Sequence, residues 1–281
     1  MTCPNCGRPF QYWETRCRWC DHFVGFPNVR TAKGQQPDLD VRYVAARNEA
    51  AANGHEKLLD IVEDVANHSC PVITVSLEAC DDLLRPGKYR NYHQRVRSYE
   101  RDPATPTSHA DRQMVGERLF PNFSDKLHYA ALSPNGHGLL NYGSITLSWR
   151  VTTDYLENRI SLLEENSYVF FGRHGLGRVG ADAPQGHQAV WSDRAKLSVA
   201  KLSADVNPAM TRTELTDLLF RSGADRNDDR FIEILIYDER GLDAEFVFRV
   251  TLDGYATTGI DQYRLDIIKE QCLSRRIEFV G

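Results

Sequence analysis

The sequence lacks the long apolar runs of a membrane protein and the strong charge of a nucleic-acid coat protein. No apolar run approaches the ~18 residues that a transmembrane helix needs. The 281 residues carry 34 basic and 39 acidic side chains, so the net charge is −5, which excludes a general phosphate-coating role but permits a local basic patch. Internal repeats and low-complexity tracts are also missing. The N-terminal Thr2-Cys3-Pro4 is not the apolar start of a secretory signal, so we expect a cytoplasmic protein without a membrane partner.

Cysteine spacing is the most specific signal in the sequence. Four of the seven cysteines form two CxxC pairs, and each such turn aims two thiolates at one point, so two turns complete the tetrahedron that Zn²⁺ prefers. We therefore predict a structural zinc site with the ligands Cys3, Cys6, Cys17 and Cys20. Two alternatives remain open: His22 could replace one ligand, or the pairs could be redox dithiols. The other three cysteines are read as small buried apolar residues.

The composition divides the chain into three regions. A zinc knuckle occupies residues 1–30 and depends on its metal to fold, and Thr31–Pro37 is expected to be its linker. A mostly helical region covers residues 38–119, with a break at Asn53-Gly54 and a further helix at about 111–119. Residues 120–281 form a third region, expected to be an α+β catalytic domain.

Short apolar segments in the third region predict strands mixed with helices. Helices are expected at 195–204 and 214–221, the latter because Thr211 and Glu214 fit a capping box. Asp238–Gly241 is read as the turn of a hairpin. The fold class is therefore α+β, with a mixed, mainly antiparallel sheet. The segments predicted to be strands are 127–132, 144–151, 167–171, 231–237, 245–252 and 276–280.

Basic and aromatic residues alternate between Lys88 and Arg101. The segment has a net charge of +4, because five basic residues accompany one acidic residue, and a helix would gather Arg90, Arg97 and Arg101 on one face. Guanidinium groups in such a row can neutralise phosphates, so these three arginines are candidate RNA or DNA contacts. The alternative is an amphipathic helix whose arginines are simply solvated.

Gly175-Leu176-Gly177-Arg178-Val179-Gly180 has the letters of a dinucleotide-binding fingerprint. That fingerprint requires a helix to begin within the glycines, whereas Asp182, Pro184 and Gly186 follow here. We therefore predict a loop.

Glu233 is the residue that is hardest to explain as part of a core. Strand periodicity places it on the same face as Phe231, Leu235 and Tyr237, with the isoleucines on the other face. A carboxylate among apolar side chains costs free energy unless it is paired or lines a cleft, and such groups concentrate at functional sites. The alternative is a cross-strand salt bridge, for example to Arg249.

Several segments taken together resemble ADP-ribosyltransferase-like toxins and effectors. Residues 231–236 and 245–250 resemble the late glutamate strand of that family and its adjoining strand. Residues 127–132 resemble the early His-Tyr strand, and residues 141–147 and 165–168 are similar to its intermediate segments. The likeness covers residues 120–250 and leaves out the zinc knuckle.

The resemblance implies that the protein cleaves NAD⁺ at the nicotinamide ribose and transfers ADP-ribose to an acceptor. Glu233 would then bind the ribose and stabilise an oxocarbenium-like state, which is electrostatic catalysis of a familiar kind. The resemblance further implies that His128 holds the adenosine ribose and that Tyr142 stacks on nicotinamide. Ser144 and Ser167 would complete the NAD⁺ site.

The resemblance also bears on the acceptor, because one position departs from the pattern of the protein-modifying families. Those families often have Glu or Gln two residues before the catalytic glutamate, whereas this sequence has Phe231, so we expect nucleic acid or another macromolecule. A cognate antitoxin or immunity protein is an expected partner. A non-enzymatic zinc-knuckle adaptor that binds nucleic acid or protein is the main alternative. A metal-dependent nuclease would need a lysine at position 235, where the chain has Leu235.

Overall fold

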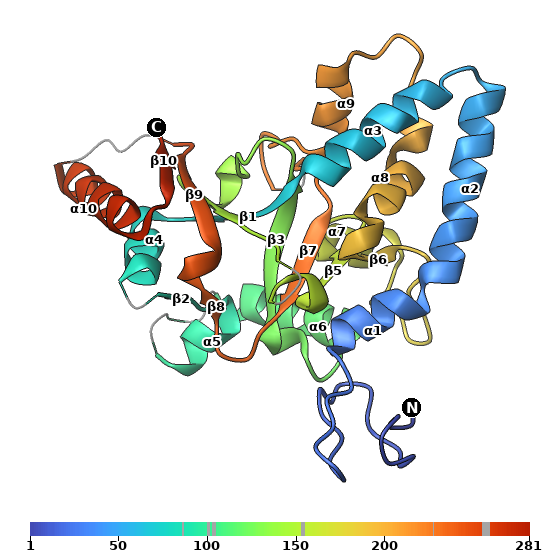
Figure 1. Cartoon of the computed structure of the whole chain (residues 1–281), viewed down its shortest axis with the longest axis horizontal. Coiled ribbons are helices and arrows are strands. Elements are labelled where there is room, and N and C mark those ends of the chain that lie inside the picture. The colour runs from blue at the N-terminus through green and yellow to red at the C-terminus, as the bar shows by residue number, and fades with distance from the viewer. Residues whose placement is uncertain (86, 100–101, 103–104, 153–154, 227, 255–258) are drawn as a thin grey trace.

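Eight strands form one mostly antiparallel sheet through the centre of the molecule (Figure 1). The computed structural model describes residues 1–281 except 86, 100–101, 103–104, 153–154, 227 and 255–258. The strand order is β10-β9-β4-β1-β3-β7-β5-β6, and only β9 and β10 run parallel. A short pair, β2 with β8, lies apart from the sheet. The strands are β1 (Cys70–Val75), β2 (Lys88–Tyr89), β3 (Leu127–Ser133), β4 (Ile145–Trp149), β5 (Ile160–Leu163), β6 (Gln188–Val190), β7 (Glu233–Tyr237), β8 (Leu242–Asp243), β9 (Val247–Leu252) and β10 (Glu278–Val280).

Helices surround this sheet. At one end of the sheet α4 packs on α10, and at the other α2, α3, α8 and α9 pack on one another (Figure 1). The helices are α1 (Pro27–Gly34), α2 (Gln36–Ala52), α3 (Glu56–His68), α4 (Leu77–Leu84), α5 (Tyr92–Arg97), α6 (Pro106–Leu119), α7 (Ser167–Arg173), α8 (Arg194–Leu202), α9 (Arg212–Leu219) and α10 (Gly259–Arg275).

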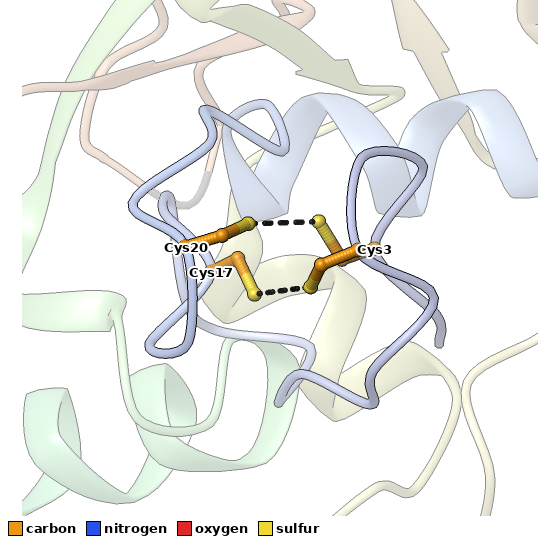
Figure 2. Close-up of side chains that lie close together, drawn as sticks. Cys3, Cys17 and Cys20 are labelled. Atoms are coloured by element: carbon orange, nitrogen blue, oxygen red, sulfur yellow. Dashed lines mark hydrogen bonds between the residues drawn. The ribbon is translucent and has the colours of Figure 1, made fainter.

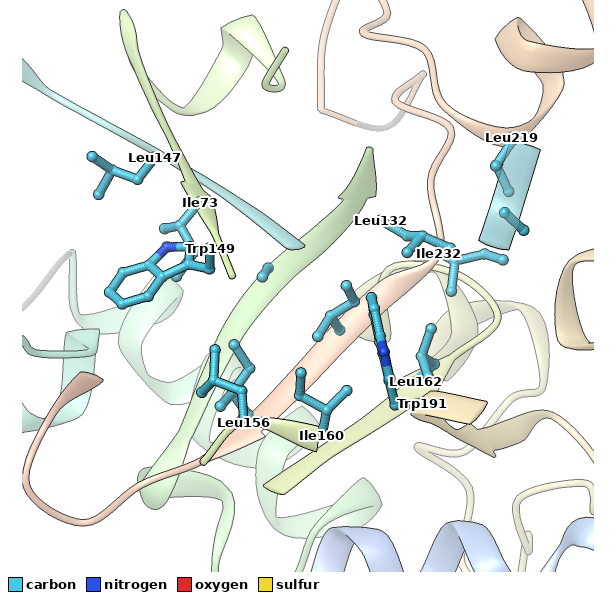
Figure 3. Packing of buried hydrophobic residues seen from close by; sticks show 14 of the residues in the cluster. Ile73, Leu132, Leu147, Trp149, Leu156, Ile160, Leu162, Trp191, Leu219 and Ile232 are labelled. Atoms are coloured by element: carbon cyan, nitrogen blue, oxygen red, sulfur yellow. The ribbon is translucent and has the colours of Figure 1, made fainter. Parts of the chain in front are cut away.

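The two faces of the sheet have different cores. Ile234 and Ile236 of β7 project onto what we call the isoleucine face, where they join a cluster that runs from Trp149 and Leu147 to Leu162 and Trp191 (Figure 3). Alternate residues of β7 project onto the opposite, glutamate face, which α6 and α7 cover through aromatic side chains such as Phe120 and Phe170. The strand periodicity of two therefore separates Glu233 from the isoleucines, as predicted.

Strand β1 lies in the middle of the sheet, between β3 and β4. It comes from the region predicted to be mostly helical, residues 38–119. Its sequence Pro-Val-Ile-Thr-Val is apolar on both faces, which is typical of an interior strand. Residues 38–119 and 120–281 therefore build one sheet together.

Local sequence signals placed several elements correctly. The break at Asn53-Gly54 separates α2 from α3, since Gly54 has a φ of +72°, a region that favours glycine. Thr211 and Glu214 form the predicted capping box of α9, and the glycines at 175–180 lie in turns after α7.

Three predictions were wrong. Residues 167–171 form helix α7 and not a strand, because Asn166 caps the Tyr168 amide and begins a helix. The expected linker 31–37 is the end of α1 and the start of α2. Asp238–Gly241 does not make a hairpin between β7 and β9, since β7 pairs with β3 and β5 while β9 pairs with β4 and β10.

The α1 segment is helical because it is anchored on the sheet. Asn28 donates hydrogen bonds to the carbonyls of Arg159 and Leu235, at 2.9 and 3.0 Å. Gln35 accepts the amides of His187 and Gln188, both at 3.1 Å. These buried polar contacts fix α1 against β5, β6 and β7.

Within the described residues, no helix has the length and apolar character needed to cross a membrane.

Candidate functional site

Four cysteines converge in the N-terminal module, residues 1–26, as the spacing predicts (Figure 2). The Cys3 and Cys20 sulfurs are 3.6 Å apart, and so are those of Cys6 and Cys17. Thiolates around tetrahedral zinc lie roughly 3.8 Å apart, given Zn–S bonds of about 2.3 Å, so this donor set fits Zn²⁺. The four cysteines could therefore hold a metal ion.

The module repeats one turn at both CxxC pairs. Cys3 accepts the Gly7 amide and donates its own to Arg8, while Cys17 accepts the Asp21 amide and donates to His22. The residues after the second cysteines, Gly7 and Asp21, both have left-handed backbone, with φ of +69° and +55°. His22 takes part through its carbonyl, and within this module only the four cysteines converge as possible metal ligands. Two equivalent turns that face each other are an arrangement suited to metal binding and not to a dithiol redox pair.

The second candidate site is built around Glu233 at the start of β7. Its carboxyl is buried, 4% exposed, and Oε2 accepts the Ser167 amide at 3.1 Å. Burial raises the pKa of Glu233 to about 8, and only hydrogen bonds from Ser167 oppose the effect. No basic side chain of the described chain pairs with this carboxyl, so the predicted alternative of a salt bridge to Arg249 is wrong: Arg249 pairs with Glu278 at 2.7 Å, at the far edge of the sheet.

Two tyrosines belong to the surroundings of Glu233. The negative charge of Glu233 adds to burial in raising the pKa of Tyr129 and of Tyr142 above the ordinary range. Tyr142 is partly exposed, and the Arg226 guanidinium lies 4.7 Å from its ring centre. Of the predicted residues, Ser167 therefore contacts Glu233 directly, while Tyr142, like Tyr129, is affected by its charge.

His128 lies on the other side of the sheet. Glu233 pairs with Ala131 and His128 pairs with Ile236, so His128 belongs to the isoleucine face. It is fully buried, its Nε2 is 3.3 Å from the Asp238 carbonyl oxygen, and burial lowers its pKa to about 4. His128 and Glu233 therefore do not line one cleft, and His128 is a neutral core residue in this fold.

The remaining predicted contacts lie away from Glu233. Ser144 precedes β4, three strands from β7, and its carbonyl accepts the amides of Asp253 and Gly254. Arg97 forms an ion pair with Asp125 at 2.7 Å and Arg90 is exposed, while Arg101 lies outside the described residues. The helix predicted over this basic segment is limited to α5, six residues long, so the expected row of arginines is not assembled by one long helix.

A polar cavity of about 810 Å³ is lined by chain neighbours of the Glu233 site, although not by Glu233 itself. Phe231, two residues before Glu233 in the chain, lines it, and so does Asn166, the residue before Ser167. Arg173, Lys201, Arg221 and Arg230 contribute positive charge, and Glu165, Asp205, Asp228 and Asp229 contribute negative charge. Lys201 donates to the Phe231 carbonyl at 2.8 Å, and burial lowers its pKa to about 8.

Sequence reasoning missed Tyr129, Asn166 and the cavity residues. Tyr129 could have been found, because it shares its face of the predicted strand with Ala131, opposite Glu233. The cavity could not, because segments 165–173, 201–205 and 218–231 meet only through the tertiary fold. A scan against protein-family models finds no match for this chain, and a search of curated proteins finds no similar sequence.

Proposed function

We propose that the protein cleaves NAD⁺ and transfers ADP-ribose to a nucleic-acid or other macromolecular acceptor, with Glu233 at the reacting ribose. The observation that carries the proposal is the buried carboxyl of Glu233, which no basic side chain of the described residues pairs with and whose chain neighbour Phe231 lines a polar cavity. A protein keeps such a group at a cost in stability, which function can explain.

Glu233 suits the charge that develops when a glycosidic bond breaks. As nicotinamide leaves, positive charge grows on the ribose, and a fixed carboxylate in a site of low dielectric constant stabilises it strongly. The cationic nicotinamide ring of bound NAD⁺ would favour the ionised carboxylate and so lower the pKa of Glu233. The Ser167 amide, which donates to Oε2, holds the carboxyl in a fixed orientation.

The cavity offers groups for the rest of NAD⁺. Arg221 and Arg230 face each other across a β-bridge and line the cavity, and guanidinium groups bind phosphate oxygens well. In this proposal the diphosphate lies near these two arginines and the nicotinamide stacks on Tyr142. Since His128 is on the opposite face, the adenosine ribose must be held by cavity residues instead of by His128.

The acceptor class is supported by two further features. Phe231 is buried at the position where protein-modifying relatives have Glu or Gln, so no carboxylate is available there to activate a protein side chain. In the N-terminal module, Arg8 lies over the ring of the half-exposed Trp19, at 5.0 Å, a pairing that can stack on a base and contact a phosphate.

The test is nicotinamide release from NAD⁺ by Glu233→Gln, which keeps the shape of the side chain and removes its charge. We expect the rate to fall on the order of a hundredfold to a thousandfold, because one electrostatic contact to the transition state is lost. In the parent protein, kcat/KM should rise as the pH increases through about 8, where free Glu233 ionises.

A matched control makes the same change elsewhere in the sheet. Glu278→Gln alters an exposed carboxylate on β10 and should leave the rate unchanged. Thermal unfolding of both variants separates loss of chemistry from loss of fold. If the parent protein releases no nicotinamide but still binds single-stranded RNA or DNA, the protein is an adaptor and the transferase proposal is wrong.

A further inference from the structure

Two histidines and a glutamate meet at the corner where β5, α7 and β6 come together. Glu164 follows β5, His174 caps the C-terminus of α7, and His187 precedes β6. One ligand atom of each lies within 4.8 Å of the others. This group is separate from the cysteines and from the residues that line the cavity.

The scaffold around this group is already fixed. The Glu164 amide donates to the His187 carbonyl at 3.1 Å, and the His187 amide donates to Gln35. Arg42 donates to Glu164 Oε2 at 2.8 Å and to the Gly186 carbonyl. The second carboxylate oxygen, Oε1, faces His187 Nδ1 at 2.5 Å.

Hydrogen bonding within the group leaves a ring nitrogen of each histidine without a partner. Arg42 donates to Glu164 Oε2, but the buried Nε2 of His174 and the buried Nδ1 of His187, which faces Glu164 Oε1, have no hydrogen-bond partner in the described chain. The His174 ring lies 5.4 Å from the His187 ring and 4.5 Å from that of Phe170. A buried imidazole nitrogen without a partner costs free energy, which a bound cation would recover.

We propose that Glu164, His174 and His187 bind a divalent transition metal of the Zn²⁺ class. Two imidazoles and one carboxylate are the donor set of three-ligand zinc sites, in which a fourth position is left for water. Ligand atoms on tetrahedral zinc lie roughly 3.3 Å apart, so Glu164 and His187 separate slightly when the metal enters. Arg42, on the outer carboxylate oxygen, orients Glu164 from the second coordination sphere.

The metal would join β6 to two elements that contact Glu233, β5 and α7. Leu163, the neighbour of Glu164, pairs with Glu233 across β5 and β7, and α7 begins at Ser167, which donates to Glu233. A metal between β5, β6 and the end of α7 therefore holds the helix that orients Glu233. The site can be tested without any enzymatic activity, so its failure is distinguishable from failure of the proposed transferase reaction.

The experiment uses the full chain with one equivalent of Zn²⁺ bound, which the four thiolates retain because Zn²⁺ binds them more tightly than Co²⁺ does. Titration with Co²⁺ should then add one further equivalent, with visible d–d absorption and without a thiolate-to-cobalt charge-transfer band. In His174→Gln the affinity for this second equivalent of Co²⁺ should fall by more than about 100-fold. The change removes a metal ligand, and loss of a hydrogen-bond partner of a ligand already lowers metal affinity about 10–100-fold.

Controls keep the result interpretable. His68→Gln removes another histidine beside a carboxylate, Asp64 at 3.1 Å, and should leave Co²⁺ binding unchanged. Since the buried Nε2 of His174 has no partner among the described residues, His174→Gln should unfold at the parental temperature without metal. His187→Gln is measured as well in case it does not. The proposal is overturned if the parent binds no second metal, if both variants retain it, or if the cobalt spectrum shows thiolate ligands.

Discussion

The N-terminal module and the sheet are stabilised in different ways. The buried apolar cluster of the module consists of Cys3, Phe10 and Cys17, with Cys20 and Val24 packed against it. The sheet, by contrast, has a continuous core on the isoleucine face and further clusters on the glutamate face. A core as small as that of the module cannot offset chain entropy, so we expect metal coordination to supply its stability, whereas apolar burial suffices for the sheet.

The two regions meet at a small polar and aromatic contact. Tyr12 donates to the Pro121 carbonyl at 3.1 Å, and its ring packs with Trp13 and Phe26 at the edge of the glutamate-face core. Arg30 of α1 donates to the carbonyls of Val24 and Glu14, at 3.0 and 2.8 Å. This contact places the module on the sheet, but it is too small to fold the module.

The largest expected effect separates the two regions. In Cys17→Ser, the N-terminal module, residues 1–26, should lose its metal and unfold, because structural zinc supplies about 10–16 kcal/mol to such modules. The sheet should keep its hydrogen-exchange protection. Metal analysis combined with hydrogen exchange measures both outcomes.

The matched variant Cys272→Ser should give the reverse pattern. Cys272 is buried in α10 against the isoleucine-face core, so its change should lower the stability of the sheet and leave the metal content intact. Cooperative loss of both regions in either variant would contradict the separation.

A smaller effect concerns the stability cost of Glu233. Its pKa rises on folding from 4.5 to about 8, so between these pH values the unfolded chain releases a proton that the folded protein retains. The contribution of Glu233 to stability is therefore most favourable below pH 4.5 and becomes less favourable as the pH rises toward 8. At pH 7 the cost is on the order of 3 kcal/mol, so Glu233→Gln should be more stable than the parent at pH 7 and equal to it at pH 4. Urea unfolding at the two pH values measures the difference, and a gap independent of pH would refute the assignment.

The smallest effect concerns the contact between the regions. Tyr12→Phe removes the hydrogen bond donated to Pro121 and the one accepted from Asn122 and keeps the ring, so we expect a loss of about 0.5–1.5 kcal/mol. The change should speed up amide hydrogen exchange in residues 1–30 and leave hydrogen exchange at the centre of the sheet unchanged. Tyr263→Phe, on an exposed side chain of α10, serves as the control. Equal protection in residues 1–30 of both variants would show that the Tyr12 hydroxyl is not part of the docking contact.

The sequence was most informative where structure is local. Two CxxC pairs predict the cysteine cluster because each turn is complete within a few residues, and alternation alone predicts which face of β7 carries Glu233. Strand pairing could not be predicted, because the partners of β7 lie about 70 and 100 residues earlier in the chain. The order of segments led us to place His128 in one site with Glu233. The pairing register of β3 with β7 puts the two side chains on opposite faces of the sheet, and this register cannot be obtained from the order of segments.

The position of β7 between β3 and β5 also has a consequence for biosynthesis. Both neighbours precede it in the chain, so their facing edges stay unpaired until residues 233–237 leave the ribosome. Unpaired apolar strand edges are templates for association with other chains. The nascent protein therefore has two unpaired strand edges, those of β3 and β5, until late in synthesis. Truncation before Glu233 should yield an aggregating fragment and not a smaller folded domain.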